Sequence, residues 1–72
     1  MDLVRLLGES IRRERLALGK SQEEVAFDAG MKRSYLSDLE RGTRNPTVRA
    51  LGRLAETLKV DAADLLKQPR SG

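Results

Sequence analysis

Apolar residues recur at helical spacing along most of the 72-residue chain, and glycine or proline separates one apolar run from the next. This spacing places the apolar side chains of each run on one face of a helix, whereas a half-buried strand would alternate apolar and polar residues. No segment shows that alternation. The pattern therefore predicts an all-α fold built from short helices.

The first two helices have recognisable end signals. Asp2 is suited to cap a helix that runs to Gly19, which can adopt a left-handed turn. Ser21 and Glu24 then form the S-x-x-E capping box, in which each side chain satisfies a backbone amide at the start of a helix. We expect this second helix to end near Gly30. The apolar stripe of the first helix has six members: Leu3, Val4, Leu7, Ile11, Leu16 and Leu18.

Glycine and proline also delimit the second half of the chain. A third helix is expected over about residues 32–40, closed by Gly42. Pro46 lies in the loop before a fourth helix, because proline is excluded from a helix interior. Asp61 and Asp64 open a short fifth helix, so residues 1–67 form one domain and residues 68–72 a flexible tail. The stripe of the fourth helix comprises Val48, Leu51, Leu54, Ala55 and Leu58.

Composition excludes several kinds of site. The chain has no cysteine and no histidine, so disulfides, thiolate sites and the usual zinc and iron ligand sets are absent, and we expect no cofactor and no metal. A serine nucleophile would lack an activating histidine, so no enzyme is expected. No apolar run approaches the roughly 20 residues that span a bilayer, which predicts a soluble, cytoplasmic protein without a membrane partner.

Charge is distributed unevenly. The 14 basic and 11 acidic residues leave a net charge of +3, which is a weak indication of an anionic partner. Between Glu40 and Glu56, however, there are four arginines and no acidic residue. A run of this kind is typical either of a solvated surface or of a surface that contacts an anion, and composition does not decide between them.

The third helix has two chemically different faces. On a helical wheel, Leu36, Leu39 and Glu40 share one side. Arginine carries a planar fork suited to guanine O6 and N7, serine donates to a base edge or a phosphate, and aspartate accepts from cytosine N4 or orients a neighbouring cation. An ordinary solvated face is the alternative interpretation. The opposite, polar side holds Arg33, Ser34, Ser37 and Asp38.

Residues 22–39 have the spacing of two helices that cross closely. Ala26 has to be small because the next helix crosses over it, and Gly30 permits the turn between the helices. The ordered segments IRRERLALGKSQEEVA, AGMKRSYLSDLERG, RNPT and LAETLKVD resemble the phage-repressor and Cro-like (XRE) family of helix-turn-helix DNA-binding proteins. The likeness extends from about Leu7 to Leu66, and the run RSYLSDLERGTRNPT is similar to controller proteins of restriction-modification systems.

The resemblance implies a compact five-helix, lambda-repressor-like domain. Its third helix enters the major groove, and the protein acts as a homodimer on a palindromic double-stranded DNA operator. It would be a transcriptional regulator, whose outward quartet on the third helix contacts bases. A repressor blocks RNA polymerase and an activator also contacts it, and the sequence does not decide between them. The alternative function is a protein-binding module such as an antitoxin.

The resemblance also implies roles for individual residues. Arg15 matches the arginine that pairs with the glutamate ending the recognition helix, here Glu40. Gln22 matches the position that binds a backbone phosphate at a helix start. Further phosphate contacts are expected from residues around the third helix: Lys32, Tyr35, Arg41, Thr43, Arg44 and Asn45. The expected dimer interface is Val60, Ala63, Leu65 and Leu66. The alternative is that the two leucines close the core.

Three positions depart from the family pattern. Lys32 stands where serine or threonine normally caps the third helix, and the missing cap costs about 1 kcal/mol. Lys59 stands where glycine commonly ends the fourth helix, so a left-handed cap there is strained. Phe27 replaces a usually polar residue, and we expect it either to pack on Tyr35 or to lie exposed near the DNA backbone.

Overall fold

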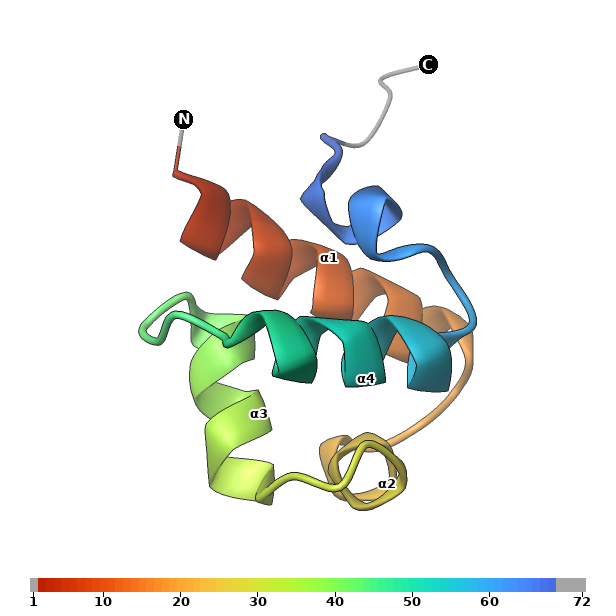
Figure 1. Ribbon diagram of the computed structural model, residues 1–72. Helices are drawn as coiled ribbons and strands as arrows, with labels where there is room; N and C mark the ends of the chain where they lie inside the picture. The colour runs from red at the N-terminus through yellow and green to blue at the C-terminus, as the bar shows by residue number, and fades with distance from the viewer. Residues whose placement is uncertain (1, 69–72) are drawn as a thin grey trace.

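The computed structural model describes residues 2–68. They form four α-helices and one 3-10 helix: α1 (Leu3–Ala17), α2 (Gln22–Asp28), α3 (Arg33–Arg41), α4 (Val48–Leu58) and η1 (Ala62–Leu66). Figure 1 shows α4 in front of α1, with α3 and α2 below them and η1 above. No strand occurs in this described part of the chain. The all-α prediction is confirmed.

The fifth predicted helix is a 3-10 helix and not an α-helix. Its five residues are closed by a bond of the i to i+3 type, in which Asp64 N donates to Asp61 O at 2.9 Å. The Asp64 carboxylate accepts from Asp61 N at 3.2 Å. A five-residue segment can form few i to i+4 hydrogen bonds, so it gains little from α-helical bonding. Gln68 is the last described residue, so most of the predicted tail lies outside the described residues.

The predicted helix ends are confirmed. Asp2 accepts hydrogen bonds from the first turn of α1, and both halves of the capping box between Ser21 and Glu24 are formed at the start of α2. Thr47 caps α4 by accepting from Ala50 N at 3.0 Å. Lys59 ends α4 at a φ of 61°, the strained left-handed cap that the sequence predicts.

A single apolar core joins all five elements. Ile11, Val25, Leu36, Leu54 and Leu65, one from each element, have no exposed surface. The core excludes several residues of the predicted stripes because they lie beyond the reach of a neighbouring element. These exposed residues, with their exposed fractions, are Leu3 (53%), Leu16 (55%), Leu18 (41%) and Val48 (88%).

α1 and α3 approach each other very closely at Gly8. A Cβ atom added at Gly8 would lie 2.2 Å from the carbonyl oxygen of Leu39, far inside van der Waals contact. Only glycine therefore fits between the two backbones. This approach fixes α3 against α1 and so determines which face of α3 points outward.

Candidate nucleic-acid interface

The turn between α2 and α3 orients the outward face of α3. Gly30 adopts a φ of 68°, and Met31 N donates to Ala26 O at 2.9 Å to close the turn. Ala26 and Ala29 are buried beneath the crossing. This is the close helix crossing that the spacing of small residues predicts.

The N-terminal end of α3 is open. Lys32 occupies the N-cap position and its side chain makes no capping hydrogen bond, as the sequence predicts. Arg33 and Ser34 are exposed, and Arg33 forms no ion pair with any described residue. The backbone amides of the first turn and one unpaired guanidinium are therefore available to an anionic ligand.

The C-terminal end of α3 carries a connected polar group, which we call the Asp38 cluster: Tyr35, Ser37, Asp38, Arg41 and Arg44. Asp38 forms ion pairs with Arg41, one turn along α3, and with Arg44 Nε at 3.6 Å. Arg41 Nη1 also donates to Ser37 Oγ at 3.3 Å. The guanidinium carbon of Arg44 lies 5.1 Å from the centroid of the Tyr35 ring, within the range of a cation–π contact.

The loop after α3 is tied to the helix at the same place. Thr43 Oγ1 donates to the carbonyl oxygen of Asp38 at 3.2 Å, and the Tyr35 hydroxyl accepts from Thr47 N at 3.4 Å. Asn45 is exposed in this loop. The structure thus brings the predicted phosphate-contacting residues after α3 onto one exposed surface next to Ser37 and Asp38.

On the inward side of α3, Glu40 is almost completely buried and fully bonded. Arg15 donates to both of its oxygens, from Nε at 2.7 Å and from Nη2 at 3.0 Å. Arg15 Nη1 also donates to Lys20 O at 2.9 Å. The hydrogen bond with Glu40 raises the pKa of Arg15, although burial acts in the opposite direction. The ion pair that the resemblance implies is present, and it ties α3 to α1.

Gln22, at the first position of α2, also contacts this pair. Its side-chain amide nitrogen donates to Glu40 Oε1 at 3.1 Å, and the residue is half-buried. The sequence suggested a phosphate contact for Gln22 but not this inward bond. One of its two amide hydrogens is used by Glu40, and the other is not engaged by that bond.

The predicted dimer residues separate into different environments. Leu65 has no exposed surface and belongs to the core, so its assignment to an interface is wrong. Val60 is half-buried and packs against the core, whereas Ala63 and Leu66 are exposed on η1. The physical reason is that η1 packs against both α1 and α4, so one of its sides faces the core.

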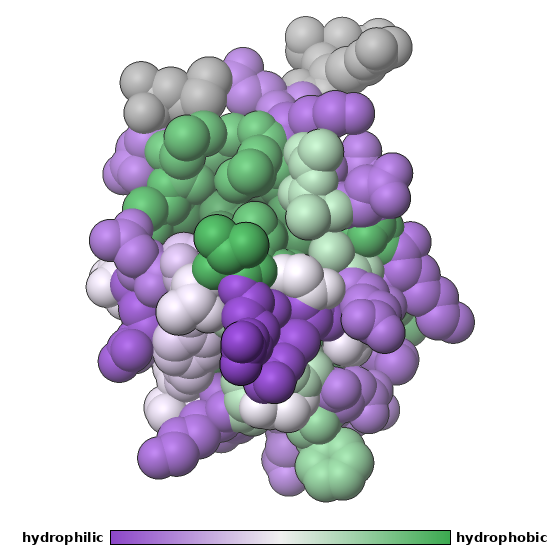
Figure 2. Space-filling view, viewed as in Figure 1, coloured by the Kyte–Doolittle hydropathy of each residue, from purple (hydrophilic) through white to green (hydrophobic). Residues whose placement is uncertain are grey.

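Apolar side chains of α1, α4 and η1 also reach the surface, and we call Leu3, Val48, Leu51 and Leu66 together the apolar face. Figure 2 shows a broad apolar area where the first half of α1 and the start of α4 lie, beside η1. Val48 is 88% exposed and Leu66 39% exposed, and half-buried Leu51 packs against the core. Patches of this kind on a small protein often mark a contact with another macromolecule.

Phe27 is 84% exposed on α2, so the expectation that it packs on Tyr35 is wrong. Tyr35 instead packs against the core and carries Arg44 on its ring. The physical reason is that α2 directs Val25 and Ala26 inward, which leaves the next residue on the outer side.

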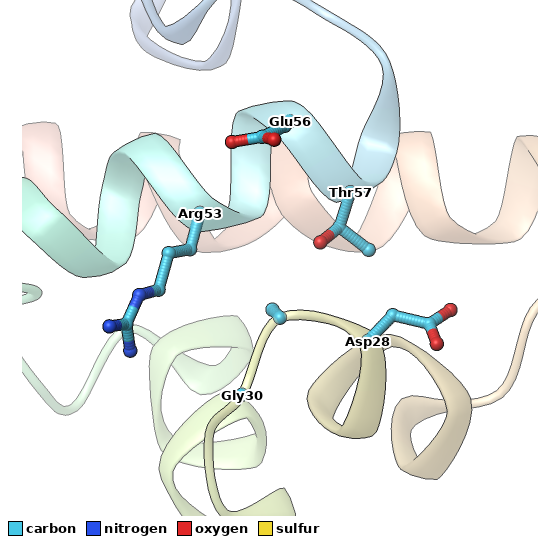
Figure 3. Close-up of a pocket in the computed structure, with 6 residues that line it drawn as sticks. Asp28, Gly30, Arg53, Glu56 and Thr57 are labelled. Atoms are coloured by element: carbon cyan, nitrogen blue, oxygen red, sulfur yellow. The ribbon is translucent and has the colours of Figure 1, made fainter.

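A hollow between the end of α2 and α4 has a volume of about 580 Å³. Its lining includes Asp28, Arg53 and Glu56, whose charged groups point in different directions (Figure 3). They do not converge on a point where a ligand would sit. Within residues 2–68 we find no group of side chains able to hold a metal ion and no helix of the length and apolarity that a bilayer span needs.

Comparisons with known proteins agree with this geometry. The helix-turn-helix family model matches residues 11–65. An HTH-type transcriptional regulator of Sinorhizobium fredii, y4dJ, is 46% identical over 92% of the chain and 86% of its own length.

Two solved structures extend the comparison. The restriction-modification controller protein C.AhdI from Aeromonas hydrophila has a TM-score of 0.84 and 37% identity over 86% of the chain and 94% of its own. SinR, a master regulator for biofilm formation solved in complex with DNA, has a TM-score of 0.81 and 35% identity over 85% of the chain and 98% of its own.

Proposed function

The chain belongs to the XRE-type helix-turn-helix family, and from this premise we propose that it binds an operator in double-stranded DNA and thereby regulates transcription. The observation that carries this proposal is the two-sided construction of α3. Its inward side is held by buried Leu36, Leu39 and the bonded Glu40, and its outward side presents an unpaired arginine. A helix fixed in this way can enter the major groove as a rigid element.

Base contacts are proposed for the exposed N-terminal part of α3. Arg33 can donate two hydrogen bonds to guanine O6 and N7, and Ser34 and Ser37 follow it on the same side. Because Arg33 has no competing ion pair within the described residues, its guanidinium is free for this contact. Asp38 lies farther along the same face, where its carboxylate is already paired with two arginines.

Phosphate contacts are proposed for the residues around this helix. They set the position of α3 on the duplex and do not depend on its sequence. The support is the common exposed surface of the residues after Glu40 and, for Lys32, the open amides at the start of α3. Gln22 would bind its phosphate with the amide hydrogen that Glu40 does not use. The proposed set is Gln22, Lys32, Tyr35, Arg41, Thr43, Arg44 and Asn45.

We propose a homodimer on a palindromic operator, with the apolar face as the contact between the two copies. Ala63 and Leu66 remain in this interface because residues three apart on a 3-10 helix share a side, and half-buried Val60, between α4 and η1, remains with them. Leu3 and Val48 replace Leu65, since they expose apolar surface and Leu65 exposes none. Val48→Asp should keep the fold and shift sedimentation toward the monomer. An unchanged mass would contradict this interface.

The test of DNA binding is selection of bound sequences from random duplexes, followed by titration of the selected site over a range of salt. We expect a palindromic motif and an affinity that falls with a log–log slope of about −0.9 for each phosphate contacted. Arg33→Ala should relax base preference, whereas Arg44→Ala should weaken binding to all sequences. If no duplex is bound, a protein-binding role such as that of an antitoxin becomes the better account.

RNA polymerase is proposed as a further partner if the protein activates transcription. Phe27 supports this, because a large apolar side chain that is 84% exposed beside Glu23 and Asp28 is suited to a protein contact. Phe27→Ser should then remove activation in a transcription assay and leave operator affinity unchanged. A protein that works on DNA alongside polymerase is expected in the cytoplasm.

A further inference from the structure

We propose that Asp38 is a positioning residue that holds Arg41 and Arg44 for DNA phosphates and weakens binding to DNA of arbitrary sequence, without contacting a base. The proposal rests on the DNA-binding function above. It differs from the simplest expectation for an outward aspartate on α3, which is acceptance of a hydrogen bond from cytosine.

The first support is that both oxygens of Asp38 are engaged. Oδ1 pairs with Arg41 and Oδ2 with Arg44, and the aspartate side chain is only 29% exposed. The arginine side chains remain 63% and 52% exposed. Each guanidinium has five N–H donors, so an arginine held by Asp38 keeps donors for a phosphate. The Asp38 carboxylate is the least exposed of the three groups, so a cytosine amine reaches it less readily than a phosphate reaches the two guanidinium groups.

The second support is the way Arg44 is held from two sides. Its guanidinium pairs with Asp38 and also lies over the ring of Tyr35. Tyr35 is itself fixed, because it packs against the core and accepts a hydrogen bond from Thr47. Holding an arginine in one orientation before binding reduces the conformational entropy lost on binding.

The effect of Asp38 should differ between the operator and other DNA. Its negative charge opposes approach to the phosphates on every duplex. Its positioning of the arginines is useful only where α3 is correctly seated, because only then do Arg41 and Arg44 meet phosphates in the orientation in which they are held. Asp38 therefore lowers non-operator binding more than operator binding.

The test compares Asp38→Asn with a matched control, Asp64→Asn. Asp64, on η1 and outside the proposed DNA surface, forms the same i to i+3 type of ion pair, with Lys67 at 3.2 Å. Both substitutions remove one negative charge. For Asp38→Asn we expect non-operator affinity to rise about fivefold at low salt, the effect of one nearby charge in water. Operator affinity should rise less, so the ratio of operator to non-operator affinity should fall. The selected motif should be unchanged.

A second variant changes the positioning but not the charge. Arg44→Lys keeps the cation but loses the planar group that lies over Tyr35. It should lower operator affinity several-fold and leave non-operator affinity near that of the unmodified protein. Thermal melting of each variant should match the parent, which separates these effects from loss of fold.

Two results would overturn the proposal. One is an operator to non-operator ratio that changes no more in Asp38→Asn than in Asp64→Asn. The other is loss of preference at a single operator base pair in Asp38→Asn, which would make Asp38 a base-contacting residue. Failure of the unmodified protein to select any motif would instead refute the proposed function on which this inference depends.

Discussion

The two sides of α3 carry one carboxylate each, and the surroundings of these carboxylates are opposite. Glu40 faces α1, is 4% exposed as a side chain, and is bonded by Arg15 and Gln22. Asp38 faces outward, is 29% exposed, and pairs with arginines that are mostly in solvent. A buried ion pair is costly to break from one side, whereas an exposed one contributes little to stability. We infer that Glu40 serves the fold and Asp38 serves binding.

The largest expected effect comes from breaking the inward pair. Glu40→Ala leaves Arg15 buried without its partner, so the free energy of unfolding should fall by about 3–5 kcal/mol. Asp38→Ala should change it by less than about 1 kcal/mol. Urea denaturation of the two variants beside the parent measures both. Equal losses would mean that burial does not distinguish the two carboxylates.

The second-largest effect tests the close approach of α1 and α3 at Gly8. Gly8→Ala would place a Cβ atom 2.2 Å from Leu39 O, so α1 and α3 must separate. We expect a loss of about 1–3 kcal/mol or more, as for other overpacked positions. Gly52→Ala is the control, because a Cβ atom at that glycine within α4 meets nothing within 4 Å. There, alanine should stabilise by about 0.5–1 kcal/mol.

Most of the helical framework, and part of the contrast between Glu40 and Asp38, can be predicted from the sequence. Capping residues such as Asp2 and Ser21 act on their own helix, so local pattern predicts them. The Arg15–Glu40 contact joins residues 25 apart and required the family resemblance. Within the candidate site, the i to i+3 spacing of Asp38 and Arg41 was a local signal for their pairing that could have been used.

The features that the sequence does not predict depend on what packs against each helix. Periodicity places Val48 and Leu54 on one apolar stripe, yet Val48 is 88% exposed and Leu54 fully buried. The stripe identifies the face of the helix that packs inward. How much of that face is buried depends on the elements that pack against it. The same limit applies to Gly8, whose close contact is with a backbone of another helix.

A smaller effect is expected at the N-terminal end of α3, which no side chain caps. Lys32→Ser adds the missing cap at α3, so the free energy of unfolding should rise by about 1 kcal/mol. The serine oxygen then accepts a hydrogen bond from a backbone amide that is proposed to bind a phosphate, and the positive charge of Lys32 is lost. Operator affinity should therefore fall while stability increases, as measured by thermal melting and DNA titration. Lys32→Ala, which loses the same charge but adds no capping oxygen, is the control for loss of charge alone.

The smallest effect comes from a third carboxylate that combines features of the first two. Glu24 lies on the surface, as Asp38 does, but it is bonded to the backbone, since its Oε1 accepts from Ser21 N at 3.0 Å. This backbone hydrogen bond is the main reason that the pKa of Glu24 is lowered from its ordinary value of 4.5. A carboxyl group with a lowered pKa in the folded state stabilises the fold above its unfolded pKa. That contribution is lost as the pH falls through the lowered folded value.

The pH dependence can be isolated with Glu24→Gln, which keeps a hydrogen-bond acceptor but does not titrate. The difference in melting temperature between the parent and this variant should be largest near neutral pH. It should shrink as the pH falls below the ordinary range of a glutamate. Glu23→Gln is the matched control, since Glu23 lies beside it in the first turn of α2 but outside the capping box. A difference that stays constant down to acid pH would show that the bond of Glu24 to the backbone does not depend on its charge, and exposure alone would then explain the contrast with Glu40.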